Sequence, residues 1–156
     1  MRRLLALSVA IALIAVTIAS VAAAGKSSFK GKRAIDAAGQ LHVTFKERGV
    51  GDQTLTYRLQ AVGLITWACG GVFYGTGGFG GPSWNDPNQR TTITAVRGRA
   101  VGTLWHQTLL GATPSCPKNE LGEILPAVMS ATSWSEITVT SSSGKVLTLR
   151  DISRTF

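Results

Sequence analysis

Two short stretches decide the fold class: QLHVTFK, residues 40–46, and QTLTYRLQAV, residues 53–62. In the first stretch, Leu41, Val43 and Phe45 alternate with polar residues. In the second stretch, the apolar positions again fall on every other residue, at Leu55, Tyr57, Leu59 and Ala61. A period of two is typical of β-strands that bury one face. Because the intervening ERGVGDQ contains two glycines and acidic residues, which are typical of a turn, we interpret the two runs as a β-hairpin.

Similar strand signals continue to the end of the chain. GLITWAC extends the second run, with Gly63 as the candidate position for a bulge. QRTTITAVR, AVGTLWHQTLL, SEITVT and KVLTLRDI follow, with tight turns expected at residues 97–99 and at Gly144. EILPAVMSATSW is ambiguous between a strand and a helical turn, and Pro126 favours an edge or a break. Since helix signals are scarce, the pattern predicts an all-β sandwich of about seven antiparallel strands.

The first 24 residues have the pattern of a signal peptide. A basic start is followed by an uncharged run and then by Ala22–Ala23–Ala24, which predicts cleavage after Ala24 and secretion. The apolar run is also long enough to cross a bilayer, so an uncleaved membrane anchor is the alternative. We therefore expect a signal peptide at 1–24, a flexible basic leader at 25–38 and the β-sandwich domain at 39–156.

The expected leader gathers four basic residues in GKSSFKGKRA: Lys26, Lys30, Lys32 and Arg33. Such a cluster is consistent with adhesion to an anionic wall, a membrane surface or nucleic acid. The alternative, which we favour at this stage, is a solvated spacer, because glycine and serine dilute the charge and no helical pattern organises it.

The chain has two cysteines, Cys69 and Cys116. An exported protein meets an oxidising environment, and two cysteines permit one pairing. Closing the long loop between them would stabilise the fold by about 4 kcal/mol in the chain-entropy model. Metal ligation is a poor alternative, because the cysteines lack CxxC spacing and the two histidines are distant.

Several of these segments together carry a resemblance. VTFKERGVGDQTLTYRLQA, CGG, SCPKNE and SATSWSEITVT resemble a group of small secreted proteins, chiefly actinobacterial. The resemblance covers residues 43–140. It implies an immunoglobulin-like sandwich with Cys69 and Cys116 as its disulfide pair, and it implies no activity. The aromatic residues and glycines between Phe73 and Trp84 depart from the pattern of this group.

The stretch CGGVFYGTGGFGGPSWNDP, residues 69–87, is the candidate binding region. We interpret it as a loop of about 18 residues tethered by the disulfide, a length typical of binding or disordered loops. Trp84 lies between prolines, so its ring would be either an exposed platform or a cap on the core, whereas Trp67, Trp105 and Trp134 are expected in the core. The candidate ligand-binding residues are Phe73, Tyr74, Phe79 and Trp84.

Catalytic and cofactor motifs are absent from the sequence. No Gly-Lys-Ser/Thr ends the glycine-rich stretch, which excludes a phosphate-binding loop. His42 and His106 are interpreted as ordinary strand residues, and no serine lies in a Gly-x-Ser-x-Gly motif. Glu47 and Asp52 flank the expected hairpin turn and are interpreted as solvated acids. We expect no catalytic residue, no metal and no cofactor.

Two hypotheses of function follow. The first is a secreted, non-catalytic protein that binds a glycan, a cell-wall polymer or another protein through the Gly/aromatic stretch. The second is a structural or surface-attached protein that its basic leader holds, without a specific ligand. Neither involves a nucleotide or a specific nucleic acid, and a membrane enters only if the signal segment is uncleaved.

Overall fold

The computed structural model describes residues 26–80, 89–107 and 113–156. The predicted signal peptide, residues 1–24, lies outside this range. The described residues form nine β-strands and no helix. The strands are β1 (Ser28–Ile35), β2 (Leu41–Arg48), β3 (Thr54–Cys69), β4 (Val72–Gly80), β5 (Arg90–Thr94), β6 (Arg99–His106), β7 (Ala127–Ser141), β8 (Val146–Thr148) and β9 (Ile152–Thr155).

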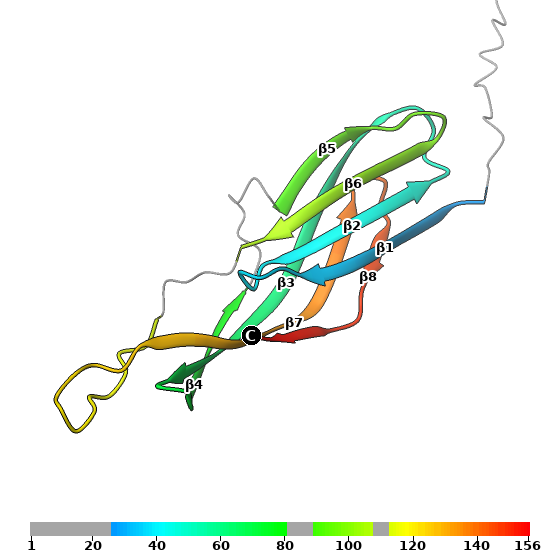
Figure 1. The fold of residues 1–156 in the computed structure, drawn as a ribbon. Helices are drawn as coiled ribbons and strands as arrows, with labels where there is room; N and C mark the ends of the chain where they lie inside the picture. Colours follow the sequence, from blue (N-terminus) through cyan, green and yellow to red (C-terminus); the bar gives the residue numbers. More distant parts are fainter. Residues whose placement is uncertain (1–25, 81–88, 108–112) are drawn as a thin grey trace, which may run out of the picture.

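The strands form two antiparallel sheets. The smaller sheet has the order β1-β2-β6. The larger sheet is centred on the two long strands β3 and β7, which pair with each other. Strands β4 and β5 pair with the two ends of β3, whereas β8 pairs with the end of β7 and β9 with its middle. Figure 1 shows that β1, β2 and β6 lie over one half of the long strands, while β4 and the start of β7 extend beyond them.

The main core lies between the two sheets and follows the alternation in the sequence. Every second residue of β2 from Leu41, and every second residue of β3 from Leu55, is buried. The core side chains around them include Leu104, Trp134 and Ile137. The prediction of an all-β sandwich is therefore confirmed, and its immunoglobulin-like character stays a prediction.

Two glycines let the sheets approach closely around Phe45. Gly31 and Gly102 lie on either side of Phe45 in the register of the three-stranded sheet. A Cβ on Gly31 would lie 2.7 Å from Leu147, and a Cβ on Gly102 would overlap Ile93. The Phe45 ring uses this space to pack against Tyr57, with 4.4 Å between ring centroids. Small residues are therefore needed on both neighbours of Phe45.

The expected hairpin between residues 40–46 and 53–62 is wrong. Strand β2 pairs with β1 and β6, whereas β3 pairs with β4, β5 and β7. The connection at residues 49–53 crosses from one sheet to the other, and its Gly49 donates a hydrogen bond to the Gly98 carbonyl, at 2.9 Å. Alternation shows which residues a strand buries but does not show which strand it pairs with.

The expectation of a flexible leader at 25–38 is wrong for residues 28–35, which form β1. This strand pairs with β2 over its whole length. Phe29 packs edge-on against Phe45, with ring centroids 6.0 Å apart. Arg33 donates a hydrogen bond from Nη2 to the Asp151 carbonyl, at 2.8 Å. The segment therefore alternates between inward-facing and outward-facing residues. Its glycines, serine and charged residues made this pattern hard to recognise in the sequence.

Of the three tryptophans expected in the core, Trp134 is buried in the main core, and Trp67 is buried near the end of β3 but outside that core. Trp105 is only half-buried, because β6 faces the core with Ala100, Leu104 and His106. Trp105 instead stacks against His42 on the outer side of the sheet, with 6.1 Å between ring centroids. The expected continuation of β3 to Cys69 is confirmed. The bulge expected at Gly63 is found slightly earlier in the strand, between Gln60 and Val62, in the pairing with β7.

Candidate functional site

The glycine-rich stretch is not one long loop. Residues 72–80 form β4, which pairs with the end of β3 as a hairpin. Gly70 and Gly71 make the turn between Cys69 and Val72, with φ values of 58° and 83°. Two consecutive residues at positive φ are what a tight hairpin turn needs, and glycine adopts them without strain. The sequence interpretation failed because glycines are read as loop, although their backbones can still pair along an exposed strand edge.

The four predicted ligand-binding residues have different positions. Phe73 and Tyr74 lie at the start of β4, and their side chains are 67% and 47% exposed. Phe79 lies near the end of β4, opposite Gly63. Trp84 lies outside the described residues, so its role as a platform stays a prediction.

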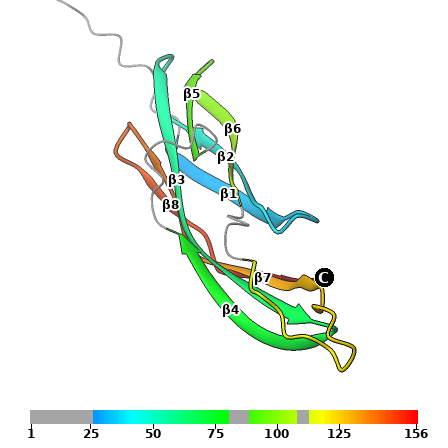
Figure 2. The same ribbon diagram turned by 90° about the vertical axis from the view of Figure 1, so that its left-hand side faces the viewer.

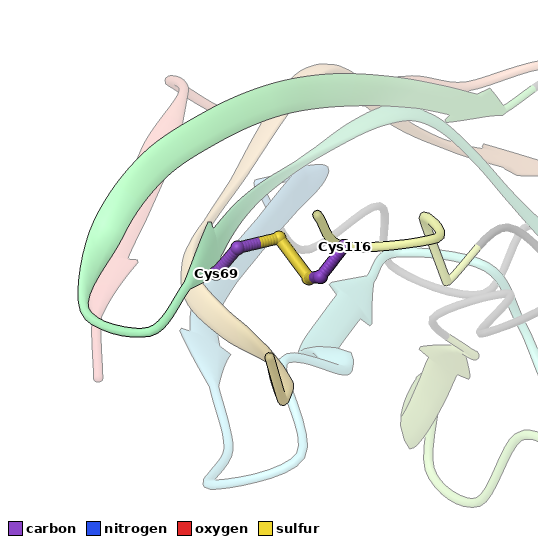
Figure 3. The surroundings of a disulfide bond; sticks show 2 residues. All are labelled: Cys69 and Cys116. Atoms are coloured by element: carbon purple, nitrogen blue, oxygen red, sulfur yellow. A yellow bond between two sulfur atoms is a disulfide. The ribbon is translucent and has the colours of Figure 1, made fainter. Parts of the chain in front are cut away.

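A disulfide joins this hairpin to the segment that precedes β7. Cys69, the last residue of β3, is bonded to Cys116, and their Cα atoms are 5.6 Å apart (Figure 3). Both cysteines are buried. The predicted pairing is confirmed, and such a bond is typical of proteins outside the reducing cytoplasm. The bond holds residues 113–126 against the end of the larger sheet.

The segment after Cys116 is an ordered turn. Asn119 accepts hydrogen bonds through Oδ1 from the backbone amides of Leu121 and Glu123, at 3.0 Å and 2.9 Å. The backbone amide of Asn119 donates a hydrogen bond to the Glu123 carbonyl, and Gly122 has a φ of 80°. An asparagine that bonds to backbone amides this way fixes a turn without help from a core. The turn presents Leu121 at its tip, with 83% of the side chain exposed.

The segments around the disulfide carry exposed apolar side chains. They come from the β4 hairpin, from the Asn119 turn and from the start of β7. Phe73 and Val128 are both opposite Ala68 in the sheet register, so they share one face, whereas Val72 is opposite Cys69 and lies on the other face with the disulfide. Figure 2 shows these three segments close together at one end of the molecule. We call this surface the disulfide end: Val72, Phe73, Tyr74, Leu121, Ile124 and Val128, each between 47% and 83% exposed.

Glu47 was expected to be a solvated turn acid, and this prediction is wrong. Its carboxylate is fully buried between the sheets. Its oxygens accept hydrogen bonds from Tyr57 at 2.9 Å and from Ser143 at 2.7 Å. Lys145 forms an ion pair with it at 3.1 Å. Burial would raise the pKa of Glu47, but the bonds from Ser143, Lys145 and Tyr57 outweigh it and lower the pKa. Asp52, its expected neighbour, is exposed and accepts a bond from the Gly98 amide.

The Glu47 cluster joins the two sheets and does not form a reactive centre. Burial, and then the Glu47 carboxylate, raise the pKa of the Tyr57 hydroxyl far above its ordinary value of 10. The tyrosine therefore stays protonated and donates its hydrogen to Glu47. Both oxygens of the carboxylate are engaged by donors and the side chain is fully buried, so it is not accessible to a substrate.

The two histidines lie on opposite faces of the three-stranded sheet. His42 lies on the outer side of β2, with Nε2 2.9 Å from the Asp36 carboxylate. His106 is buried with its ring 4.8 Å from that of Trp134. Neither histidine has a serine or cysteine nucleophile among the hydrogen-bond partners in the described residues. Those residues also contain no group of three acids, histidines or cysteines that could hold a metal ion.

One shallow hollow of about 250 Å³ opens on the outer face of the larger sheet. It lies where β7 bulges at Glu136, a non-glycine residue with a φ of 50°. Its lining is mixed and consists of Ser133, Trp134, Ser135, Asp151, Ile152 and Ser153. None of these groups is paired with a base, so the hollow has no catalytic arrangement.

Comparisons with known proteins do not identify a family. No family model, no curated protein and no solved structure matches this chain. The described part of the chain contains no helix that could serve as a membrane span. Any statement of function therefore rests on the surface itself.

The sequence analysis found two of the six residues of the disulfide end, Phe73 and Tyr74. It missed Leu121 and Ile124, although both are apolar residues beside the glycine in NELGEI, where a turn should be polar. Apolar residues in an otherwise polar turn were the signal that could have identified them. Val128 gave none, since its exposure depends on the half of β7 that extends past the smaller sheet.

Proposed function

We propose that the protein is a secreted, non-catalytic binding protein and that the disulfide end is its contact surface. The observation that carries this proposal is that six exposed apolar side chains lie on three segments that meet at one end of the molecule. Scattered single apolar residues are normal on a surface, but a contiguous group marks an interaction site. The disulfide and the Asn119 turn hold the surface in one shape, which lowers the ordering cost of binding.

The composition of this surface favours a protein partner. A sugar platform requires flat aromatic rings with polar groups beside them, whereas four of the six side chains here are aliphatic. Aliphatic and aromatic side chains together are typical of the centre of a protein–protein contact. A glycan remains the alternative ligand if Trp84 adds a further ring to the same end.

The test uses the purified, disulfide-bonded protein and three forms of it. The first form is the wild type, and the second replaces Phe73, Leu121 and Ile124 with serine. The third is a matched control that replaces exposed valines elsewhere, Val96, Val101 and Val146, also with serine. Each form is immobilised and exposed to cell-surface proteins of the producing cell, and captured proteins are identified by mass spectrometry.

We expect the wild type and the control to capture the same protein and the disulfide-end variant to lose it. The captured protein is then purified, and its dissociation constant is measured against each form. Equal affinity for all three forms would refute the proposal. Binding on a glycan array that depends on Trp84 would replace the protein partner with a sugar.

A further inference from the structure

The outer face of the three-stranded sheet carries a second and different surface. Strand register places five cations there: Lys30 is opposite Lys46, Arg48 is opposite Arg99, and Lys32 follows Lys30 on the same side. All except the half-buried Lys46 are exposed. We call this surface the basic face: Lys30, Lys32, Lys46, Arg48 and Arg99.

The basic face gathers charges that are far apart in the sequence. Lys30 and Lys32 come from the expected leader, but their neighbour Arg33 points to the other side, where it bonds to Asp151. Lys46 and Arg48 come from β2, and Arg99 comes from the start of β6. The pairing of three strands, rather than a run of basic residues, therefore produces the surface.

No carboxylate neutralises these cations in the described residues. Glu47 lies between Lys46 and Arg48 in the sequence, but it points into the core. Asp36 is engaged by His42 at the far end of β2. None of the five cations takes part in an ion pair within the described ranges, 26–80, 89–107 and 113–156. The pKa of Lys46 is lowered, mainly by partial burial and to a smaller extent by repulsion from Arg48, Arg99 and Lys30. Repulsion of this kind is expected in a cluster of like charges.

The shape of the basic face suits an extended chain. Neighbouring strands are about 4.8 Å apart and alternate residues along a strand about 6.7 Å apart, so the cations form a flat array. The positions between and beside them hold uncharged side chains such as Thr44, Val101 and Thr103. A single small anion would contact one or two of these cations, whereas a linear polymer can lie across all five.

We propose that the basic face binds a linear polymer of repeating phosphate groups outside the cytoplasm. Lysine ammonium groups act as point charges toward phosphate, and arginine forks can donate to two of its oxygens. This surface is separate from the disulfide end, and binding here does not depend on the function proposed above.

Two other polyanions fit the face less well. Single-stranded nucleic acid needs aromatic rings free to stack on bases, but the one tryptophan of this face, Trp105, is already stacked on His42. A membrane needs apolar side chains that enter the headgroup region, and among the residues surrounding the cations only Val101 is a large, exposed apolar one.

The experiment measures binding of the purified protein to long-chain sodium polyphosphate. A face variant carries Lys30→Gln, Lys46→Gln and Arg99→Gln. A control variant carries Arg90→Gln, Lys118→Gln and Arg150→Gln, which removes the same net charge from exposed positions on other surfaces. Circular dichroism and thermal unfolding confirm that both variants are folded.

We expect the face variant to lose roughly 100-fold in affinity, at about fivefold for each of the three cations, and the control to lose much less. The fall of affinity with salt should also become shallower in the face variant, because fewer phosphates are neutralised. Equal losses in both variants would show that net charge alone is responsible and would overturn the proposal.

Three further probes test the choice of polymer: polygalacturonate at an equal concentration of charged groups, single-stranded DNA, and vesicles containing phosphatidylglycerol. We expect each to bind more weakly than polyphosphate. Equal or tighter binding of polygalacturonate would overturn the preference for phosphate. Tighter binding of DNA or of vesicles would replace the polymer with a nucleic acid or a membrane.

Discussion

The two ends of strands β3 and β7 differ in what covers their inner face. At one end, the three-stranded sheet covers it, and the shared core includes Phe45, Tyr57 and Trp134. At the other end, the inner residues Ile65, Trp67 and Cys69 are buried but lie outside that core. There the disulfide to Cys116 holds a single segment in place of a second sheet.

This difference explains where each kind of surface residue is found. A sheet with a full core behind it can present charge on its outer side, as the basic face does. At the disulfide end no second sheet covers the long strands, so less apolar surface is buried there. This end depends on a covalent link, and some of its apolar side chains stay exposed. Small units that lack a large core are commonly stabilised by disulfides in this way.

The largest expected effect comes from removing the covalent link. Replacing Cys69 and Cys116 with serine should lower the free energy of unfolding by about 4 kcal/mol, because the unfolded chain regains the entropy of a 47-residue separation. Urea denaturation measures the loss. Native-state hydrogen exchange should show faster exchange in residues 113–126 and β4 than in β2 and β6. Uniform acceleration across both halves would contradict the separation of the two ends.

The second effect tests the link between the sheets at Glu47. Glu47→Gln should cost about 2–3 kcal/mol at neutral pH, because a buried, charged acceptor loses its ion pair and its strongest hydrogen bonds. The pKa of Glu47 is lowered in the fold, so the stabilisation is present above the ordinary value of 4.5 and is lost as the pH falls through the lowered value.

Urea denaturation of wild type and Glu47→Gln between pH 7 and pH 3 checks the sign. The gap in unfolding free energy should stay constant down to about pH 5 and narrow below it. A gap that widens in acid would show that the carboxyl is protonated in the fold, contrary to the hydrogen bonds from Ser143 and Tyr57.

The sequence predicted the strands of the sandwich half better than their pairing. The alternation of Leu41, Val43 and Phe45 correctly marked the inner face of β2. Glu47 continues this alternation and therefore also faces inward. The sequence analysis placed it in a turn because it is charged and is followed by glycines. The crossing between sheets at Gly49 left no local signal, because a hairpin and a crossover can use the same turn residues.

The disulfide end was less predictable. The cysteine pair followed from counting, and Phe73 and Tyr74 were proposed because they are aromatic residues in a glycine-rich stretch that was interpreted as a loop. Strand β4 was missed because its pairing depends on the long edge of β3 rather than on its own residues. The basic face was missed for a similar reason, since Arg99 meets Lys30 and Lys46 only after three strands have paired.

A third effect compares one glycine from each half. Gly102→Ala should cost about 1–3 kcal/mol, because the new Cβ would lie 2.8 Å from Phe45 in a filled core. Gly75→Ala in β4 should be close to neutral, since no atom lies within 4 Å of its new Cβ. Thermal unfolding of both variants gives the contrast. A similar loss at both positions would show that β4 is packed as tightly as the sandwich half.

The smallest expected effect lies at the tip of the Asn119 turn. Leu121→Ser should change the free energy of unfolding by no more than about 0.5 kcal/mol, because the side chain is 83% exposed and contributes little to the core. Asn119→Ala is the matched comparison: it should cost about 1 kcal/mol or more, since the amides of Leu121 and Glu123 lose their common acceptor. Urea denaturation measures both variants under the same conditions. If Leu121→Ser cost more than Asn119→Ala, Leu121 would be a packed residue of the fold, and its exposure could no longer support the disulfide end as a contact surface. A negligible loss leaves the side chain available, at little cost in stability, for a partner that covers it.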